Sequence, residues 1–75
     1  MPNATLKHVR FHDYGNGRIH ASGHIHGDDK KRFPDGTLVT TSRVAEWDET
    51  TGILTTKNSI YKVETPVIGI VPNIA

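Results

Sequence analysis

The residues best suited to chemistry are five histidines and two arginines near the start of the chain. From residue 18 to residue 26 the sequence is Arg-Ile-His-Ala-Ser-Gly-His-Ile-His, so polar and apolar residues alternate with a period of two. In an extended strand this period places the polar side chains on one face, namely Arg18, His20, Ser22, His24 and His26. The run from His8 to His12, which contains Arg10, alternates in the same way. A face so rich in imidazole and guanidinium groups predicts binding of an anion, a metal ion or an acidic partner.

Anion binding is the preferred interpretation of this face. Guanidinium groups bind phosphate and carboxylate through paired hydrogen bonds, and charged imidazoles add further donors. The cationic run 30–32, beside Phe33, would extend the site toward a nucleotide or a nucleic acid. The predicted anion-binding residues are Arg10, Arg18, His20, His24, His26, Lys31 and Arg32. The alternative is that this surface is only the solvated side of a hairpin, followed by a solvated charged loop.

Three of the histidines are also a candidate metal site, His20, His24 and His26. Same-face neighbours in a strand lie about 6.5–7 Å apart, a gap that two histidines can bridge, and zinc is bound by neutral imidazole. Such a site would hold zinc or nickel weakly or adventitiously, so no cofactor is expected.

Catalysis is not expected from this sequence. The chain has no cysteine, which excludes thiolate catalysis and cysteine-based zinc sites. No nucleophile, base and orienting group can be placed together from the sequence, so we expect a non-enzymatic binding protein. A small metal-dependent enzyme is a further alternative.

A second polar cluster is possible around residue 43. If Thr40-Thr41-Ser42-Arg43 meets Thr55-Thr56, their hydroxyls and the guanidinium would form a pocket for a small anion. The alternative is that these threonines are present because threonine favours strands.

The elements that must position these residues are all predicted to be strands. No segment sustains the apolar spacing of a helix, β-branched residues are abundant, and turn signals recur about every ten residues. This pattern predicts an all-β domain, a small antiparallel sandwich or barrel of about six short strands. The expected strands are 6–12, 18–26, 37–41, 44–47, 53–56 and 60–63.

The first hairpin turn is predicted at residues 13–17, where Gly-Asn-Gly tolerates positive φ. With pleating uninterrupted from Leu6 to His26, this turn would place His12 opposite Arg18. The next outward pairs would be Arg10 with His20 and His8 with Ser22. The expected core is Val9, Phe11, Ile19, Ala21, Ile25, Val39, Ala45, Trp47, Leu54, Tyr61 and Val63.

The last ten residues differ from the rest, because they are almost wholly apolar and contain two prolines, Pro66 and Pro72. We therefore predict an all-β domain over 1–65 and an apolar C-terminal arm or last strand over 66–75. Prolines would interrupt a central strand, and a small domain gains stability from oligomerisation. We expect the arm to form a homo-oligomer interface through Val67, Ile68, Ile70, Val71 and Ile74.

Charge and hydropathy limit the setting of the protein. The formal net charge of the 75 residues is +1, but residues 1–32 carry six Lys or Arg against three Asp. The sequence shows no basic start followed by an apolar stretch and no apolar stretch of membrane-spanning length, so neither a signal peptide nor a membrane span is expected. A cytoplasmic protein without a membrane partner is expected.

The segment Phe33-Pro34-Asp35-Gly36-Thr37-x-Val39-x-Thr41-Ser42-x-Val44, followed by Thr55-Thr56-x-Asn58-Ser59-x-Tyr61, resembles a pattern in small accessory proteins of bacteriophages and prophages. The resemblance covers about thirty residues, mostly of strand and turn chemistry. It implies an accessory protein in the host cytoplasm that sequesters a nucleotide or inhibits a host defence protein by stoichiometric binding. A protein inhibitor with an acidic host target is therefore the first alternative to an anion-binding protein.

Overall fold

Six β-strands make up the regular structure of this protein. The computed structural model describes residues 2–64, 66–72 and 74, and within them it contains no helix. The strands are β1 (Ala4–Asp13), β2 (Ile19–His26), β3 (Thr37–Thr40), β4 (Val44–Asp48), β5 (Ile53–Thr56) and β6 (Ile60–Val63). The prediction of a small all-β domain of about six strands is confirmed, because β-branched segments and turn residues alternate along the chain.

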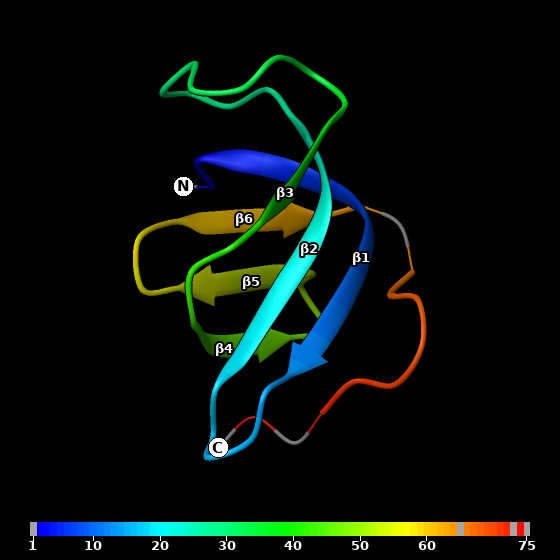
Figure 1. The fold of residues 1–75 in the computed structure, drawn as a ribbon. Coiled ribbons are helices and arrows are strands. Elements are labelled where there is room, and N and C mark those ends of the chain that lie inside the picture. Colours follow the sequence, from blue (N-terminus) through cyan, green and yellow to red (C-terminus); the bar gives the residue numbers. More distant parts are fainter. Residues whose placement is uncertain (1, 65, 73, 75) are drawn as a thin grey trace.

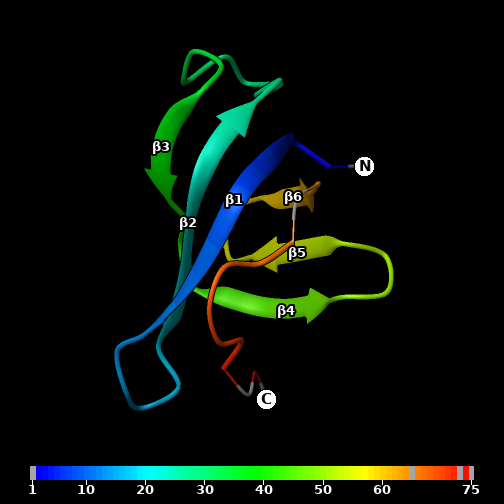
Figure 2. The ribbon, with the colours of Figure 1, turned by 90° about the vertical axis from the view of Figure 1, so that its right-hand side faces the viewer.

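The strands form one mixed sheet in the order β3-β2-β1-β6-β5-β4. Each half is an antiparallel meander, and the two halves join through β1 and β6, the one parallel pair among the named strands. The sheet folds over, so that β4–β6 cross behind β1–β3 and the apolar side chains are enclosed between them (Figures 1 and 2). One side of the β1–β3 half therefore faces away from the core.

The first hairpin turn occurs where it was predicted, but its register differs. The amide of Tyr14 donates to the carbonyl of Arg18 over 2.8 Å, and the amide of Gly15 donates to Asp13 Oδ1 over 2.8 Å. Arg18 is consequently a turn residue, and the expected pair of His12 with Arg18 is wrong. The outward cross-strand pairs are His12 with His20, Arg10 with Ser22, Lys7 with His24 and Thr5 with His26.

A β-bulge at His8 also corrects the prediction of uninterrupted pleating. The pairing of β1 with β2 shifts between Lys7 and Arg10, and His8 adopts a φ of 56°. Leu6 and Phe11 lie five residues apart, so a regular strand would direct them to opposite faces. The extra residue lets both point into the core, which is why Leu6 is fully buried although the regular alternation excludes it.

The core otherwise follows the prediction, with one exchange on β4. Ala45 is exposed and Val44 is buried, because a second irregularity in pairing falls between Val44 and Glu46. Trp47 is partly buried against the core, with its ring centroid 5.7 Å from that of Phe11. The buried apolar residues are Ala4, Leu6, Val9, Phe11, Ile19, Ala21, Ile25, Val39, Val44, Leu54, Tyr61 and Val63.

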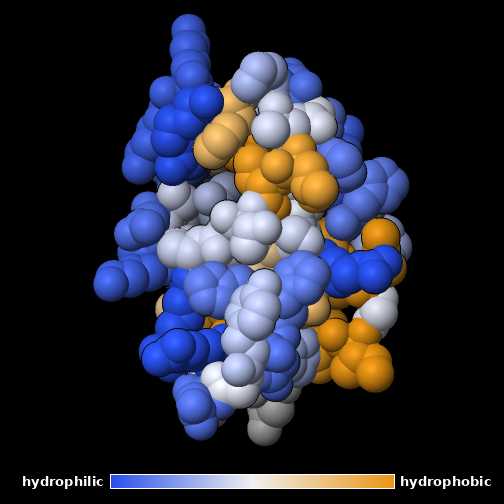
Figure 3. All heavy atoms as spheres, viewed as in Figure 1, coloured by the Kyte–Doolittle hydropathy of each residue, from blue (hydrophilic) through white to orange (hydrophobic). Residues whose placement is uncertain are grey.

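The C-terminal segment 66–72 runs beside β1 (Figures 1 and 2). The amide of Ile68 donates to the carbonyl of Val9 over 2.8 Å, and Arg10 and Ile68 form an isolated parallel bridge. Val67 and Ile74 pack against the core of their own chain, whereas Ile70 is 88% exposed. Figure 3 shows apolar surface where Figure 1 draws this segment. Of the predicted regions 1–65 and 66–75, residues 1, 65, 73 and 75 lie outside the described residues. A homo-oligomer interface formed by the C-terminal segment stays a prediction.

No helix long and apolar enough to span a membrane occurs in the described part of the chain.

Candidate anion-binding face

The outward side of β1–β3 gathers most of the predicted basic residues. Along β2 the burial alternates without a break, so the side chains of His20, His24 and His26 all face away from the core. On β1 the side chain of Lys7, before the bulge at His8, faces outward, and after the extra residue the side chain of Arg10 faces outward as well. We define the basic face as the outward side chains of these strands: Thr5, Lys7, Arg10, His12, His20, Ser22, His24, His26, Leu38 and Thr40.

The basic face carries only positive charge, because its ten members include Lys7 and Arg10 and none of them is acidic. Arg10 forms no ion pair with an acidic residue that the structure describes. Lys7 lies 3.9 Å from Glu64 Oε1, at the side where β1 meets the C-terminal segment. Both side chains of that pair are partly exposed, so the pair contributes little to stability. Arg10 is therefore the cation most available to an incoming anion.

Two histidines of the face are fixed by backbone carbonyl groups. Nδ1 of His20 lies 2.9 Å from the carbonyl oxygen of Thr41, and Nδ1 of His24 lies 3.0 Å from that of Gly36. A carbonyl only accepts, so in both rings Nδ1 carries the hydrogen and Nε2 is left for other partners. A neutral ring then offers a lone pair at Nε2, which repels an anion. A protonated ring offers an N–H donor and a positive charge.

At one end of the face an exposed tyrosine lies between two histidines. The ring of Tyr14 is stacked at 6.3 Å from that of His12 and makes an edge contact at 5.4 Å with that of His20. His12 Nε2 is also 2.8 Å from the hydroxyl of Ser22. Tyr14 remains 64% exposed, so its ring is available for stacking. The predicted set omitted His12 and Lys7, which the cross-strand register places on this face.

Three predicted anion-binding residues lie off the basic face, in loops. Arg18 belongs to the hairpin turn, and Lys31 and Arg32 belong to the loop between β2 and β3. Nε of Arg32 lies 3.3 Å from Asp28 Oδ2, and its Nη2 lies 3.4 Å from Asp28 Oδ1. Arg32 thus already has a carboxylate partner. Its guanidinium also lies 5.7 Å from the centroid of the Phe33 ring.

Asp28 organises this loop from a buried position. It accepts hydrogen bonds from the amides of Lys30 (3.2 Å) and Arg32 (2.9 Å) as well as from the Arg32 side chain. Burial acts to raise the pKa of Asp28, but the bonds from Arg32 and Lys30 outweigh it, so that pKa lies below its ordinary value. The hydrogen bond that the Arg32 side chain donates to the Asp28 carboxylate in turn raises the pKa of Arg32. The pair is a structural clamp within the loop.

The metal-binding interpretation finds no ligand group here. Among the residues described, no three His, Asp or Glu side chains are grouped closely enough to hold a metal ion. His20 and His24 are four residues apart along β2, a Cα separation of about 13 Å. Their Nδ1 atoms bond to carbonyls at opposite ends of β3.

The hydroxyl groups near residue 43 serve the fold. Thr41 Oγ1 accepts from the amide of Ala21 and donates to the carbonyl of Ser42, and Ser42 Oγ donates to Thr56 Oγ1. Thr56 Oγ1 donates to the carbonyl of Ser59. These hydroxyls join β2, the connection between β3 and β4, and the β5–β6 turn, where backbone groups would otherwise lack partners.

Comparison of this chain with protein-family models, with curated proteins and with solved structures found no significant match. The class established here is that of a small all-β domain with a one-signed basic face.

Proposed function

We propose that this protein is a non-enzymatic binding protein whose basic face holds a single-stranded nucleic acid through its phosphates. The observation that carries the proposal is the gathering of Arg10 and four histidines on one face that has no acidic member. Phosphate contacts of this kind supply most of the affinity of sequence-independent binders.

The shape of the basic face favours a strand over a single nucleotide. β2 alone has eight residues, which corresponds to a length of about 26 Å. Neither of the two pockets described in this protein is lined by a residue of the basic face. Cationic groups spread along an open surface match a backbone that carries one charge per nucleotide.

The exposed ring of Tyr14 supports the same ligand. It stands at the end of the face beside His12 and His20, where a base could stack on it while the neighbouring phosphates meet the imidazoles. Tyr14 supplies a single ring for such stacking. Stacking would therefore contribute a small part of the affinity, and the phosphates the larger part.

Binding to this face should depend on protons. Because the Nδ1 hydrogens of His20 and His24 are already donated to carbonyls, only the imidazolium form can donate from Nε2 to a phosphate. The affinity for a phosphate backbone should consequently be higher in acid, where imidazole is protonated, than in alkali.

The test is a fluorescence-anisotropy titration of a labelled twelve-residue oligothymidylate at low salt. Binding should weaken as the salt concentration rises. The logarithm of the dissociation constant should increase with the logarithm of the salt concentration, with a slope of about 0.7 per phosphate contact. The Arg10→Gln variant should bind several-fold more weakly, and its salt slope should fall by about 0.7. The matched control is Lys57→Gln, which removes a cation that does not belong to the basic face, and this variant should bind as the wild type does. Absence of binding at low salt and pH 6, or equal affinity of Arg10→Gln and wild type, would overturn the proposal.

The histidine contribution is tested separately with the double variant His20→Gln and His24→Gln. A glutamine amide can still donate to the carbonyls of Thr41 and Gly36, but it cannot gain a charge. The variant should retain the salt dependence due to Arg10 and lose most of the pH dependence. An unchanged pH profile would exclude these two rings from the site.

The second candidate function is stoichiometric inhibition of a host protein with an acidic surface. Leu38 favours it, because this residue is 65% exposed and lies opposite His24 on the same face. An apolar side chain among cations is typical of protein interfaces, whose centres are more apolar than their rims. Leu38→Ser would weaken such a complex and leave oligonucleotide binding unchanged, so one variant separates the two functions.

A further inference from the structure

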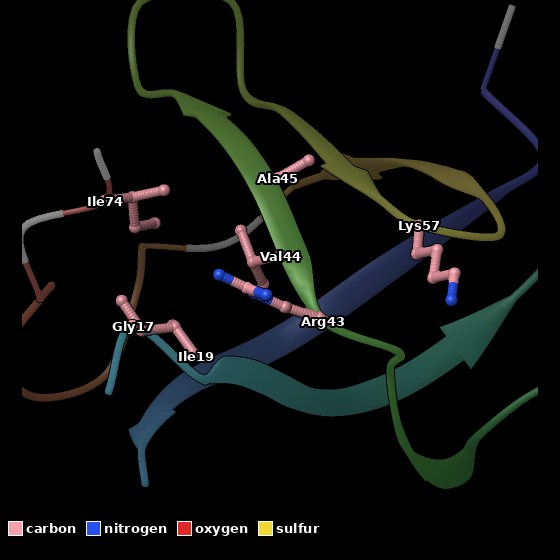
Figure 4. Close-up of a pocket in the computed structure, with 7 residues that line it drawn as sticks. All are labelled: Gly17, Ile19, Arg43, Val44, Ala45, Lys57 and Ile74. Carbon is pink, nitrogen blue, oxygen red and sulfur yellow. The ribbon is translucent and has the colours of Figure 1, made fainter. Parts of the chain in front are cut away.

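A pocket distinct from the basic face lies between the first hairpin and β4. Its volume is about 490 Å³, which falls in the range of small-molecule sites. Its walls are apolar and come from Ile19, Val44, Ala45 and Ile74, while Arg43 and Lys57 supply two cations. Gly17 completes the lining from the hairpin turn (Figure 4). None of these seven residues belongs to the basic face.

The position of Arg43 makes it the head-group contact of this pocket. Figure 4 shows its side chain extending beside Val44 toward the side of Gly17. A Cβ built on Gly17 would lie 3.5 Å from Arg43 Nη2, an ordinary contact, so the guanidinium reaches the hairpin turn. Arg43 forms no ion pair with any acidic side chain that the structure describes. A guanidinium in this situation offers its donors to a ligand.

Lys57 adds a second charge from a different element. Its amide donates to the carbonyl of Arg43 over 3.0 Å, which holds the start of β4 against the turn between β5 and β6. Both side chains are exposed, so neither cation bears the cost of burial. None of the seven described residues that line the pocket is acidic, so this lining favours a negatively charged ligand.

We infer that this pocket binds a small carboxylate with an apolar body. The carboxylate would lie against Arg43, whose side chain extends away from Lys57 (Figure 4), and the aliphatic or aromatic body would cover Ile19, Val44 and Ile74. Such a ligand satisfies both halves of the lining, since the guanidinium pairs with the carboxylate and the apolar walls are removed from water. The inference does not depend on the nucleic-acid proposal, because the two sites share no residue.

The experiment uses octanoate as the probe, with acetate and octanol as probes for the head and the body alone. Binding is followed in ¹H–¹⁵N spectra of the full chain. Octanoate should shift the amides of Gly17 and Ala45 and leave that of Ser22, on the basic face, unchanged. Acetate and octanol should each bind at least about tenfold more weakly than octanoate, because either one makes only part of the contacts. Equal binding of octanol and octanoate would overturn the inference.

Two exposed positions allow matched variants. Arg43→Gln should weaken octanoate binding about tenfold, the usual effect of losing a charge-assisted hydrogen bond, and Arg10→Gln should not change it. Ala45→Phe should fill the pocket and prevent binding, whereas Ala45→Ser should preserve it. Melting curves of all four variants show whether they fold. Folded Arg43→Gln and Ala45→Phe variants that bind octanoate as the wild type does would exclude the pocket.

Discussion

Gly23 lies directly against the backbone of Lys7 on the neighbouring strand. A Cβ built on Gly23 would approach the Lys7 carbonyl oxygen to 3.1 Å and a methyl of Val9 to 3.2 Å. This close approach occurs at the bulge, where β1 places an extra residue opposite β2. The absence of a side chain at residue 23 therefore permits the bulge, and the bulge places Lys7 and Arg10 on the same face of the sheet.

Gly23→Ala should destabilise the protein. The added methyl group meets backbone as well as a core side chain, and overpacking of this kind costs about 1–3 kcal/mol. Urea unfolding measures the change in the free energy of unfolding. Thr40→Ala, at an exposed position of the adjacent strand β3, serves as control and should change stability by less than about 0.5 kcal/mol. Equal stability of both variants would show that the strands separate easily at the bulge.

Substitutions of His8 should follow the tolerance of each residue for a left-handed backbone. His8 adopts a φ of 56°. His8→Val should lower the free energy of unfolding by roughly 1–2 kcal/mol, because a β-branched side chain is strained in this conformation. His8→Asn should be nearly neutral, since asparagine populates this conformation readily. Thermal unfolding of the two variants measures the difference. If valine were tolerated as well as asparagine, β1 would have to fold without the positive φ at residue 8.

The Asp28 clamp should make part of the stability depend on acid. Because the folded pKa of Asp28 lies below its ordinary value of 3.8, the ionised group stabilises the fold above about pH 4. That contribution is lost as the pH falls from the ordinary value through the lowered one. Asp28→Asn should therefore melt at a lower temperature than the wild type at neutral pH, and the difference should shrink as the pH falls below the ordinary value of 3.8. Glu49→Gln, at an exposed turn, is the control, and a gap that stays constant with pH would contradict the role of Asp28.

The C-terminal segment allows fold and assembly to be tested separately. Val67 packs against the core, so Val67→Ser should lower the free energy of unfolding by about 1–2 kcal/mol. Ile70 is 88% exposed, and Ile70→Ser should instead reduce the size of the particle if this segment joins subunits. Analytical ultracentrifugation of wild type and Ile70→Ser measures that size. Identical sedimentation of the two proteins would exclude Ile70 from an interface.

The alternation of residues 18–26 was enough to predict β2 and its outward histidines. A strand directs successive side chains to opposite faces, and this short-range rule needs no partner strand. The turn at Gly15-Asn16-Gly17 was likewise predictable, because all three residues tolerate the positive φ that they adopt. The six strands and most of the core follow from the same local signals.

Pairing between strands was decided only in the tertiary structure. Leu6 and Phe11 have to share the core, and this requirement, which no local pattern contains, introduces the bulge. The turn, which includes Arg18, moves Arg10 from His20 to Ser22. The pairing of Arg32 with a buried carboxylate four residues earlier also depends on the folded loop. The pocket beside β4 joins residues 17, 43, 57 and 74, which lie far apart in the chain. Local preference fixes which side chains share one strand face, whereas the packing of two sheet halves determines which strands, cations and apolar walls meet.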